Sequence, residues 1–282
     1  MIPQEKKGRK LVWHDEFDGN CLDTSKWFFR RSMHNPDVYY DNCEKNIRVE
    51  DGNLHLQVHR TDIDDKLYTL SEGCTTLTKM NFKYGYIEMS GRLPMRKGAW
   101  PSFWMLSRTH FMTAPYTAEI DIFEAFSSAD TIGSALHKWQ RTDGGVVHEQ
   151  FVDKKEYISH YKFENAENLN NEYHTYALEW DKDYLRFYVD DNCYMEYPID
   201  ERGEFGRYNL GMDGFHDFFY VLFNNEIFTK NSWHPENCDL NDDDEMPIDY
   251  YIDYIRLYQK DGEELLLEED IKTLPHTNEW IL

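Results

Sequence analysis

Residues 119–124 read EIDIFE, which places three carboxylates among three apolar side chains. Side chains alternate between the two faces of a strand, so Glu119 and Asp121 share one face while the two isoleucines point into a core. Glu124 lies at an odd offset from Glu119, and a regular strand would bury its carboxylate on the apolar face at a high cost. A β-bulge inserts one extra residue and would return Glu124 to the face of the other two acids. The hexapeptide therefore predicts a bulged strand with three acids on one side.

A cluster of this kind is typical of glycosidases, in which two carboxyl groups share the chemistry. The alternative is a solvated amphipathic strand, because acids alternating with isoleucine also describe a half-exposed strand. The chain holds 53 Asp and Glu against 30 Lys and Arg, so acidic strands are expected by composition alone. The remaining sequence has to decide between the two interpretations.

Composition favours a globular β protein. The 282 residues suffice for one large β domain or two small ones. A hydrophobic content of 40% and an aromatic content of 16% exceed those of a disordered acidic chain. The net charge of -23 repels phosphate backbones and disfavours nucleic acid as a partner. It also weighs against a densely sulfated substrate.

The five cysteines are widely spaced and form no C-x-x-C pair, which disfavours a zinc ribbon or a redox motif. No apolar run reaches membrane-spanning length, and the first residues lack the apolar core of a signal peptide. We therefore expect no membrane partner, and we also expect a monomer. It would be cytoplasmic as written, or secreted if the sequence is a mature fragment.

Short alternating segments recur along the chain. Residues 45–59 read as two strands around the turn 51–53, and residues 185–197 as two strands around the turn 190–192. Residues 262–271 are expected to form a short helix or a solvated acidic tail. Many short strands without long helical periodicity predict a single all-β sandwich over about residues 10–260, followed by an acidic extension over 261–282. Further strand-like runs lie at 82–93, 100–106, 118–126, 132–138, 173–180 and 250–258.

With these strands laid out, the chain resembles glycoside hydrolase family 16 over nearly its whole length. The resemblance implies a concanavalin-like β-jelly-roll sandwich of two antiparallel sheets with an open concave cleft. The blocks that carry it, in order around the hexapeptide, are HDEFDG (14–19) with LDTSKW (22–27), NIRVEDGNLHLQ (46–57), YGYIEMSGRLP (84–94), GAWPSFWML (98–106), HTYALEWDKDYLRFYVDD (174–191) and YYIDYIRLYQ (250–259).

The resemblance also implies roles for the three acids. Glu119 would be the nucleophile, Glu124 the general acid/base, and Asp121 would orient the pair by hydrogen bonding. Retaining glycosidases hold the two reacting carboxyls roughly 5–5.5 Å apart. Clustered like charges raise one another's pKa, so we expect the cluster to hold a proton near neutral pH.

Several aromatic and polar residues are candidates for substrate binding. Trp100 and Trp104 lie four residues apart on one strand and can stack on sugar rings, although core packing is the common alternative. His137 matches a family position near the acid/base and can tune a neighbouring acid, or it is an ordinary hydrogen-bonded histidine. Trp139 is a weaker candidate. Asn224 matches an asparagine on a cleft strand, after which the sequence EIFTKNSWHPE replaces a glycine-rich stretch of laminarinase-type members.

A structural calcium ion on the convex side is also implied by the resemblance. Its ligands would be Glu16, the backbone carbonyl of Gly52, and Asp253, because oxygen ligands of this kind suit Ca²⁺. The alternative for Asp253 is an ordinary carboxylate at the end of a strand. The chemistry itself would need no cofactor.

The function implied is an endo-acting, retaining β-glycan hydrolase acting on a polysaccharide or oligosaccharide. The bulged motif resembles the laminarinase, agarase and porphyranase branches, whereas the lichenase and xyloglucan-active branches have one residue fewer between the last two acids. The acidic charge leans towards a β-1,3-glucan of the laminarin type. The alternatives are a β-galactanase on agar or porphyran-type or host glycans, and a non-catalytic carbohydrate-binding module, against which the three acids argue.

Overall fold

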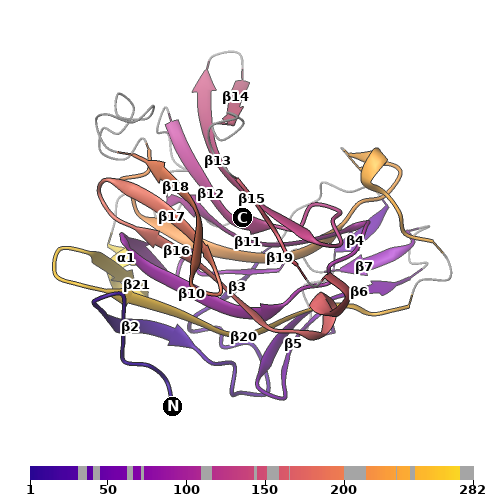
Figure 1. Ribbon diagram of the computed structural model, residues 1–282, viewed down its shortest axis with the longest axis horizontal. Coiled ribbons are helices and arrows are strands. Elements are labelled where there is room, and N and C mark those ends of the chain that lie inside the picture. Colours follow the sequence, from indigo (N-terminus) through magenta and orange to yellow (C-terminus); the bar gives the residue numbers. More distant parts are fainter. Residues whose placement is uncertain are drawn as a thin grey trace.

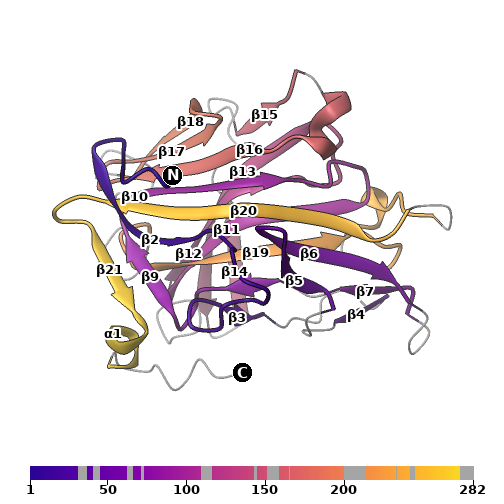
Figure 2. The same cartoon turned by 90° about the horizontal axis from the view of Figure 1, so that it is seen from below.

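The protein is built from two β-sheets packed face to face, as the computed structural model shows (Figures 1 and 2). The structure describes residues 1–30, 37–40, 45–61, 66–70, 73–108, 116–142, 145–150, 159–164, 166–199, 214–232, 234–241 and 245–273. In this part of the chain no helix is both long and apolar enough to span a membrane.

The first sheet has 11 strands and forms the convex layer. Its main order is β18-β17-β16-β10-β20-β6-β7-β4, with β1, β2 and β5 at its side. The strands are β1 (Glu5–Lys6), β2 (Arg9–Asp15), β4 (Val38–Tyr40), β5 (Ile47–Glu50), β6 (Asn53–Arg60), β7 (Tyr68–Leu70), β10 (Gly85–Arg92), β16 (His174–Trp180), β17 (Tyr184–Val189), β18 (Asn192–Pro198) and β20 (Ile248–Gln259).

The second sheet has 10 strands and curves so that its outer face is concave (Figure 1). Its main order is β14-β13-β12-β11-β19-β8-β3, with β9, β15 and β21 attached. The strands are β3 (Phe28–Phe29), β8 (Cys74–Thr75), β9 (Met80–Lys83), β11 (Ala99–Ser107), β12 (Tyr116–Glu124), β13 (Thr131–Thr142), β14 (Gly145–Gln150), β15 (His160–Lys162), β19 (Phe219–Ile227) and β21 (Glu264–Leu267). Short helices are η3 (Ala166–Asn171), η5 (Pro235–Asn237) and α1 (Glu268–Lys272).

The main core fills the space between the sheets. Alternate residues of each strand point inward, as the period of two requires. They meet in one large buried cluster that includes Phe103 of β11, Ile120 of β12 and Phe223 of β19 from one sheet, and Leu56 of β6 and Ile255 of β20 from the other. Nearly all strand pairs are antiparallel, β4 with β7 being parallel. The predicted all-β sandwich of two sheets is confirmed.

Both predicted hairpins are present. β5 and β6 are joined at Asp51 and Gly52, and β17 and β18 at Asp190 and Asp191. All four turn residues have positive φ, between 48° and 72°. Two consecutive residues of this kind are what a type I′ hairpin turn requires, and its twist matches that of the strands.

The C-terminal segment differs from the expectation of a helix or a solvated tail. Glu264–Leu267 forms β21, which pairs with β9, and only Glu268–Lys272 is helical. The reason is alternation: Leu265 packs against the main core, whereas Leu266 packs on a separate apolar cluster. Figure 2 shows β21 and α1 beside β9 at one end of the molecule.

Candidate active site

Strand β12 contains the predicted bulge. Towards β11, Trp104 lies opposite Asp121 and Phe103 opposite Phe123, so Ile122 has no partner there. Ile122 and Phe123 are both buried in the main core, although they are consecutive. Two inward-facing residues in succession shift the alternation by one position. Glu124 therefore returns to the outer face, as the sequence predicts.

The bulge is supported by Ser134, a residue that the sequence reasoning missed. On β13, Gly133 lies opposite Glu124 and Ala135 opposite Asp121, which leaves Ser134 facing the bulge. Its hydroxyl donates a hydrogen bond of 2.7 Å to the carbonyl oxygen of Ile122. A buried carbonyl without a partner would cost stability, so this side chain stabilises the irregular backbone. Counting residues across from the extra position could have identified Ser134.

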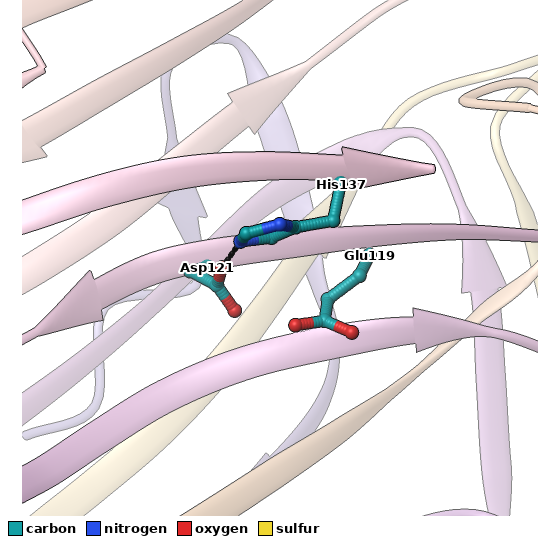
Figure 3. Close-up of side chains that lie close together, drawn as sticks. All are labelled: Glu119, Asp121 and His137. Atoms are coloured by element: carbon teal, nitrogen blue, oxygen red, sulfur yellow. Dashed lines mark ion pairs between the residues drawn. The ribbon is translucent and has the colours of Figure 1, made fainter. Parts of the chain in front are cut away.

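Two of the acids, Glu119 and Asp121, lie close to His137 (Figure 3). His137 on β13 lies opposite Glu119, and its Nε2 is 2.9 Å from Oδ2 of Asp121. One polar atom from each of Glu119, Asp121 and His137 lies within 4.8 Å of the others. The structure thus brings His137 against Asp121, next to Glu119, on the strand beside the acids.

Burial dominates the electrostatics of the cluster. Asp121 is 2% exposed, and burial raises its pKa to about 8. Burial also raises the pKa of Glu124 to about 8, with a further rise from the charge of Asp121. The hydrogen bond from Trp100 and the charge of His137 act in the opposite direction on the pKa of Glu124. At neutral pH the cluster therefore retains protons, as a general acid requires.

The spacing of Glu119, Asp121 and His137 would also admit a cation. A carboxyl must be deprotonated before it can ligate a metal. The raised pKa of Asp121 keeps that group protonated at neutral pH. A cation at this position would therefore have to displace that proton.

Trp100 points its indole N–H at the acid/base candidate. Its Nε1 donates a hydrogen bond of 2.8 Å to Oε1 of Glu124. Phe228 stacks on the indole with centroids 5.1 Å apart and an interplanar angle of 11°, while Phe126 meets it edge-on at 5.2 Å. These contacts fix the direction of the N–H. Stacking of Trp100 on a sugar stays a prediction, and one of its faces is taken by Phe228.

Trp104 and Asn224 form a second unit on the floor of this face. Nε1 of Trp104 donates to Oδ1 of Asn224 at 2.6 Å, and the hydroxyl of Ser102 donates to the same oxygen at 2.8 Å. The Arg30 guanidinium lies 4.8 Å from the Trp104 ring centroid. Within the described part of the chain, the amide nitrogen of Asn224 has no hydrogen-bond partner, and the residue is 4% exposed. The side chain of Trp139 lies outside the described residues.

The residues of the predicted calcium site lie on the other layer. Arg256 donates from Nε to Oε1 of Glu16 at 2.9 Å and from Nη2 to Oε2 at 2.5 Å. Gly52 lies in the turn between β5 and β6, and burial raises the pKa of Asp253, with an added rise from the charge of Glu16. A guanidinium held by both oxygens of Glu16 does not fit a calcium ligand set. Calcium stays a prediction, and no chemistry is assigned to it.

Comparison with known proteins adds to this geometry. Residues 12–260 match the family model described as the GH16 domain of beta-porphyranases A-D. A glucan endo-1,3-beta-glucosidase A1 from Niallia circulans is 25% identical over 279 residues, covering 90% of this chain and 38% of that protein. The chain spans little more than a third of the length of the first curated relatives that it matches.

Two solved structures match with the same TM-score of 0.70. One is the laminarinase catalytic domain from Thermotoga maritima, with 27% identity, covering 89% of this chain and 98% of that one. The other concerns endo-acting O-glycanases with which members of the human gut microbiota initiate mucin breakdown; it has 25% identity and covers 97% and 98% of the two chains. The bulged acidic strand, the two-layer fold and a family match over most of the sequence agree, and the chain belongs to glycoside hydrolase family 16.

Proposed function

We propose that the protein is an endo-acting β-glycan hydrolase that works by retaining double displacement. The observation that carries the proposal is the β12 bulge, which puts Glu119, Asp121 and Glu124 on one outer face while Ile122 and Phe123 stay in the core. Two carboxyls with separate roles are what this reaction needs.

In the first step Glu119, as a carboxylate, attacks the anomeric carbon and forms a covalent glycosyl ester. Glu124 gives its proton to the glycosidic oxygen, so the bond to the leaving sugar breaks without releasing an alkoxide. The raised pKa of Glu124 supports its part as the proton donor at neutral pH. Trp100 holds the carboxyl of Glu124 in position through its N–H.

In the second step water attacks the same carbon from the side that the leaving sugar has vacated. Glu124, now ionised, takes a proton from that water, and Glu119 leaves as a carboxylate. Asp121 lies between the two glutamates in sequence and contacts His137. Its charge acts on the pKa of Glu124, so the protons belong to the cluster and not to one residue.

The leading substrate class is a β-1,3-linked glucan. Support comes from the endo-1,3-beta-glucosidase of Niallia circulans and the laminarinase domain of Thermotoga maritima. The net charge of -23 agrees with an uncharged polymer. A monomer acting on polysaccharide chains is proposed.

A second class, a galactose-containing or mucin-type glycan, has its own support. The matching family model is of the porphyranase type, and the O-glycanase structure covers 97% of the chain. The Arg30 guanidinium over Trp104 places a positive group on the floor of the concave face. A guanidinium at this position favours a sugar that carries an anionic substituent over unsubstituted glucan.

The deciding experiment measures new reducing ends from laminarin, lichenan, agarose, porphyran, carrageenan and mucin O-glycans. Release of internal fragments from laminarin supports the glucan, and release from porphyran or mucin glycans supports the second class. Binding of a glycan without any release would show instead a carbohydrate-binding module. Proton NMR of the first product identifies the anomer, and an inverted anomer would contradict the double displacement.

A further inference from the structure

We propose that β21 and α1, residues 264–272, form a wall of the substrate path beside the nucleophile and thereby limit which glycan chains can be bound. The matched family domain ends at residue 260, so this segment lies outside it. The inference rests on the proposed function of Glu119 and deepens it by naming a specificity element for the same site.

The floor next to Glu119 is apolar. Leu106 of β11 lies opposite Glu119, and Tyr220 of β19 lies opposite Leu106. Partners that face each other across antiparallel strands point to the same side of a sheet. Leu106 and Tyr220 therefore belong to the same concave face as the nucleophile.

Side chains on an open outer face would be exposed to solvent, but these are not. Tyr220 is 1% exposed, and Ile271 of α1, at 0%, packs in the same cluster. Trp104 and Leu266 border this cluster and are partly buried. The C-terminal segment therefore lies over the row that begins at Glu119. The whole cluster consists of Leu77, Leu106, Tyr220, Leu222 and Ile271.

Tyr220 lies in the same row across the sheet as Glu119, and its electrostatics agree with this position. Burial raises the pKa of Tyr220, and the charges of Arg30 and Glu119 both act on it, the former lowering and the latter raising it. Its hydroxyl is buried and has no hydrogen-bond partner among the described residues. A segment that packs into the cluster of Leu106 and Tyr220 therefore lies beside the row that contains the nucleophile.

The segment is anchored along its length. β21 pairs with β9 from Glu264 opposite Lys83 to Leu267 opposite Met80. Lys79 donates to Glu268 at 2.9 Å, which ties the first turn of α1 to the residues before β9. A segment held by a strand pair, an ion pair and a buried isoleucine is a fixed part of the face.

The position of the wall predicts its effect. Glu119 attacks the anomeric carbon of the sugar that stays on the enzyme, so a wall beside Glu119 bounds the sites for the retained part of the chain. Glu268, Glu269 and Asp270 lie in its first turn, where Lys79 pairs with Glu268 and Lys272 pairs with Glu268 and Glu269.

The test uses two adjacent leucines of β21 as a matched pair. Leu266→Ala weakens the packing of the wall on the concave face, whereas Leu265→Ala removes the same atoms from the side facing the main core. Ile271→Ser releases α1 itself. Each variant is compared with the parent enzyme for kcat/KM on a short and a long β-1,3-gluco-oligosaccharide, or on galactan fragments if the substrate panel selects those.

We expect Leu266→Ala and Ile271→Ser to change the ratio of kcat/KM between long and short chains on the order of tenfold, mainly through KM, and to lengthen the retained fragment. Leu265→Ala should lower Tm without changing that ratio. Equal ratios in all variants would overturn the wall. If the parent cleaves none of the glycans, the proposed function fails independently of the wall. Calorimetric binding of the same oligosaccharides to the parent and the variants then tests the wall. A length preference that Leu266→Ala and Ile271→Ser leave unchanged would overturn it.

Discussion

The indole nitrogen of Trp100 donates a hydrogen bond of 2.8 Å to Oε1 of Glu124. This single contact joins a residue expected to stack on sugars to the group expected to move the proton. A donor stabilises the charged form of a carboxyl and lowers its pKa. The contact therefore opposes the rise in the pKa of Glu124 that burial causes.

Replacing Trp100 with Phe should move the alkaline limb of the pH profile upward. In the parent, kcat/KM should fall as pH rises through about 8, because Glu124 then loses the proton that it must donate. Without the N–H, the pKa of Glu124 rises further and the limb follows it, while kcat falls because the carboxyl is less well oriented. The measurement is kcat/KM from pH 5 to 10.

Trp104→Phe is the matched control for this change, because the N–H of Trp104 bonds to Asn224 and not to an acid. It should leave the alkaline limb in place even if it raises KM. If the alkaline limb lies at the same pH in the parent and in Trp100→Phe, the hydrogen bond does not affect the pKa of Glu124.

Glu119→Gln should stop turnover while leaving Tm within about 2 °C of the parent. The amide keeps the shape of the side chain but cannot attack the anomeric carbon, so kcat should fall by at least about 10³-fold. With Glu119→Ala, added azide should restore part of the cleavage by taking the place of the missing carboxylate. Normal turnover by either variant would mean that another group is the nucleophile.

Asp121→Asn should become relatively more stable than the parent as pH rises. The pKa of Asp121 is raised in the folded protein to about 8, so the folded state holds this proton more tightly than the unfolded chain does. The parent therefore loses stability between about pH 4 and pH 8, and the asparagine variant is spared that loss. Melting temperatures at pH 5, 7 and 9 should show a growing difference in favour of Asp121→Asn.

Asp130→Asn provides the contrasting control. The hydrogen bonds from Thr131 and Lys162 lower the pKa of Asp130, so its contribution is present above the unfolded pKa and is lost only as pH falls through the lower folded pKa. Its difference in Tm from the parent should therefore be flat from pH 5 to 9. A flat difference for Asp121→Asn as well would contradict the assigned protonation.

Ser134→Ala should lower both stability and activity. The hydroxyl satisfies the carbonyl of Ile122 at 2.7 Å, and leaving that buried oxygen unpaired costs roughly 1–3 kcal/mol. A bulge that relaxes also displaces Glu124, so kcat should fall with stability. Ser107→Ala, on β11, removes a buried hydroxyl that accepts from the backbone N–H of Ala118 on β12, and it should lower Tm without an equal loss of kcat. Similar losses of kcat in both variants would show that Ser134 does not control the position of Glu124.

Removal of divalent ions should leave Tm unchanged within about 1 °C. Arg256 already neutralises Glu16 through two hydrogen bonds, so the charge that calcium would supply is present within the chain. Melting curves after EDTA treatment and after addition of calcium chloride check this. A rise in Tm of several degrees on addition of calcium would instead indicate that the convex layer binds the ion.

The sequence was most informative where the controlling physics is local. Each of three predicted features depends on residues that are close to one another in the sequence: the alternation of EIDIFE, the turn at Asp190 and Asp191, and the apolar period of two. Each of these features is present. Contacts that depend on the register between distant strands could not be predicted from the sequence. Nothing near residue 100 in the sequence reveals that Phe228 stacks on Trp100.

The C-terminal segment was predicted only in part, for a related reason: it contains the short helix, but also the strand β21. Its composition suggested an acidic helix or tail, but the alternation of Leu265 and Leu266 matters only once β9 provides an edge to pair with. Ile271 packs in the same buried cluster as Tyr220, which is fifty-one positions earlier in the chain. Only the fold brings the two residues into one cluster, so the sequence alone could not predict it.

The bulge in β12 also makes the site tolerant of one particular kind of genetic change. Ile122 and Phe123 act as a pair of inward positions, and losing either one would restore plain alternation, with the third acid still facing outward. An in-frame loss of a single codon would thus move the acid/base by one residue along the strand, about 3.3 Å, without sending it into the core. Gaining a codon there would turn it inward. Evolution can therefore step between the long and the short form of this motif in one event, and the spacing of the two glutamates becomes a heritable variable separate from their identity.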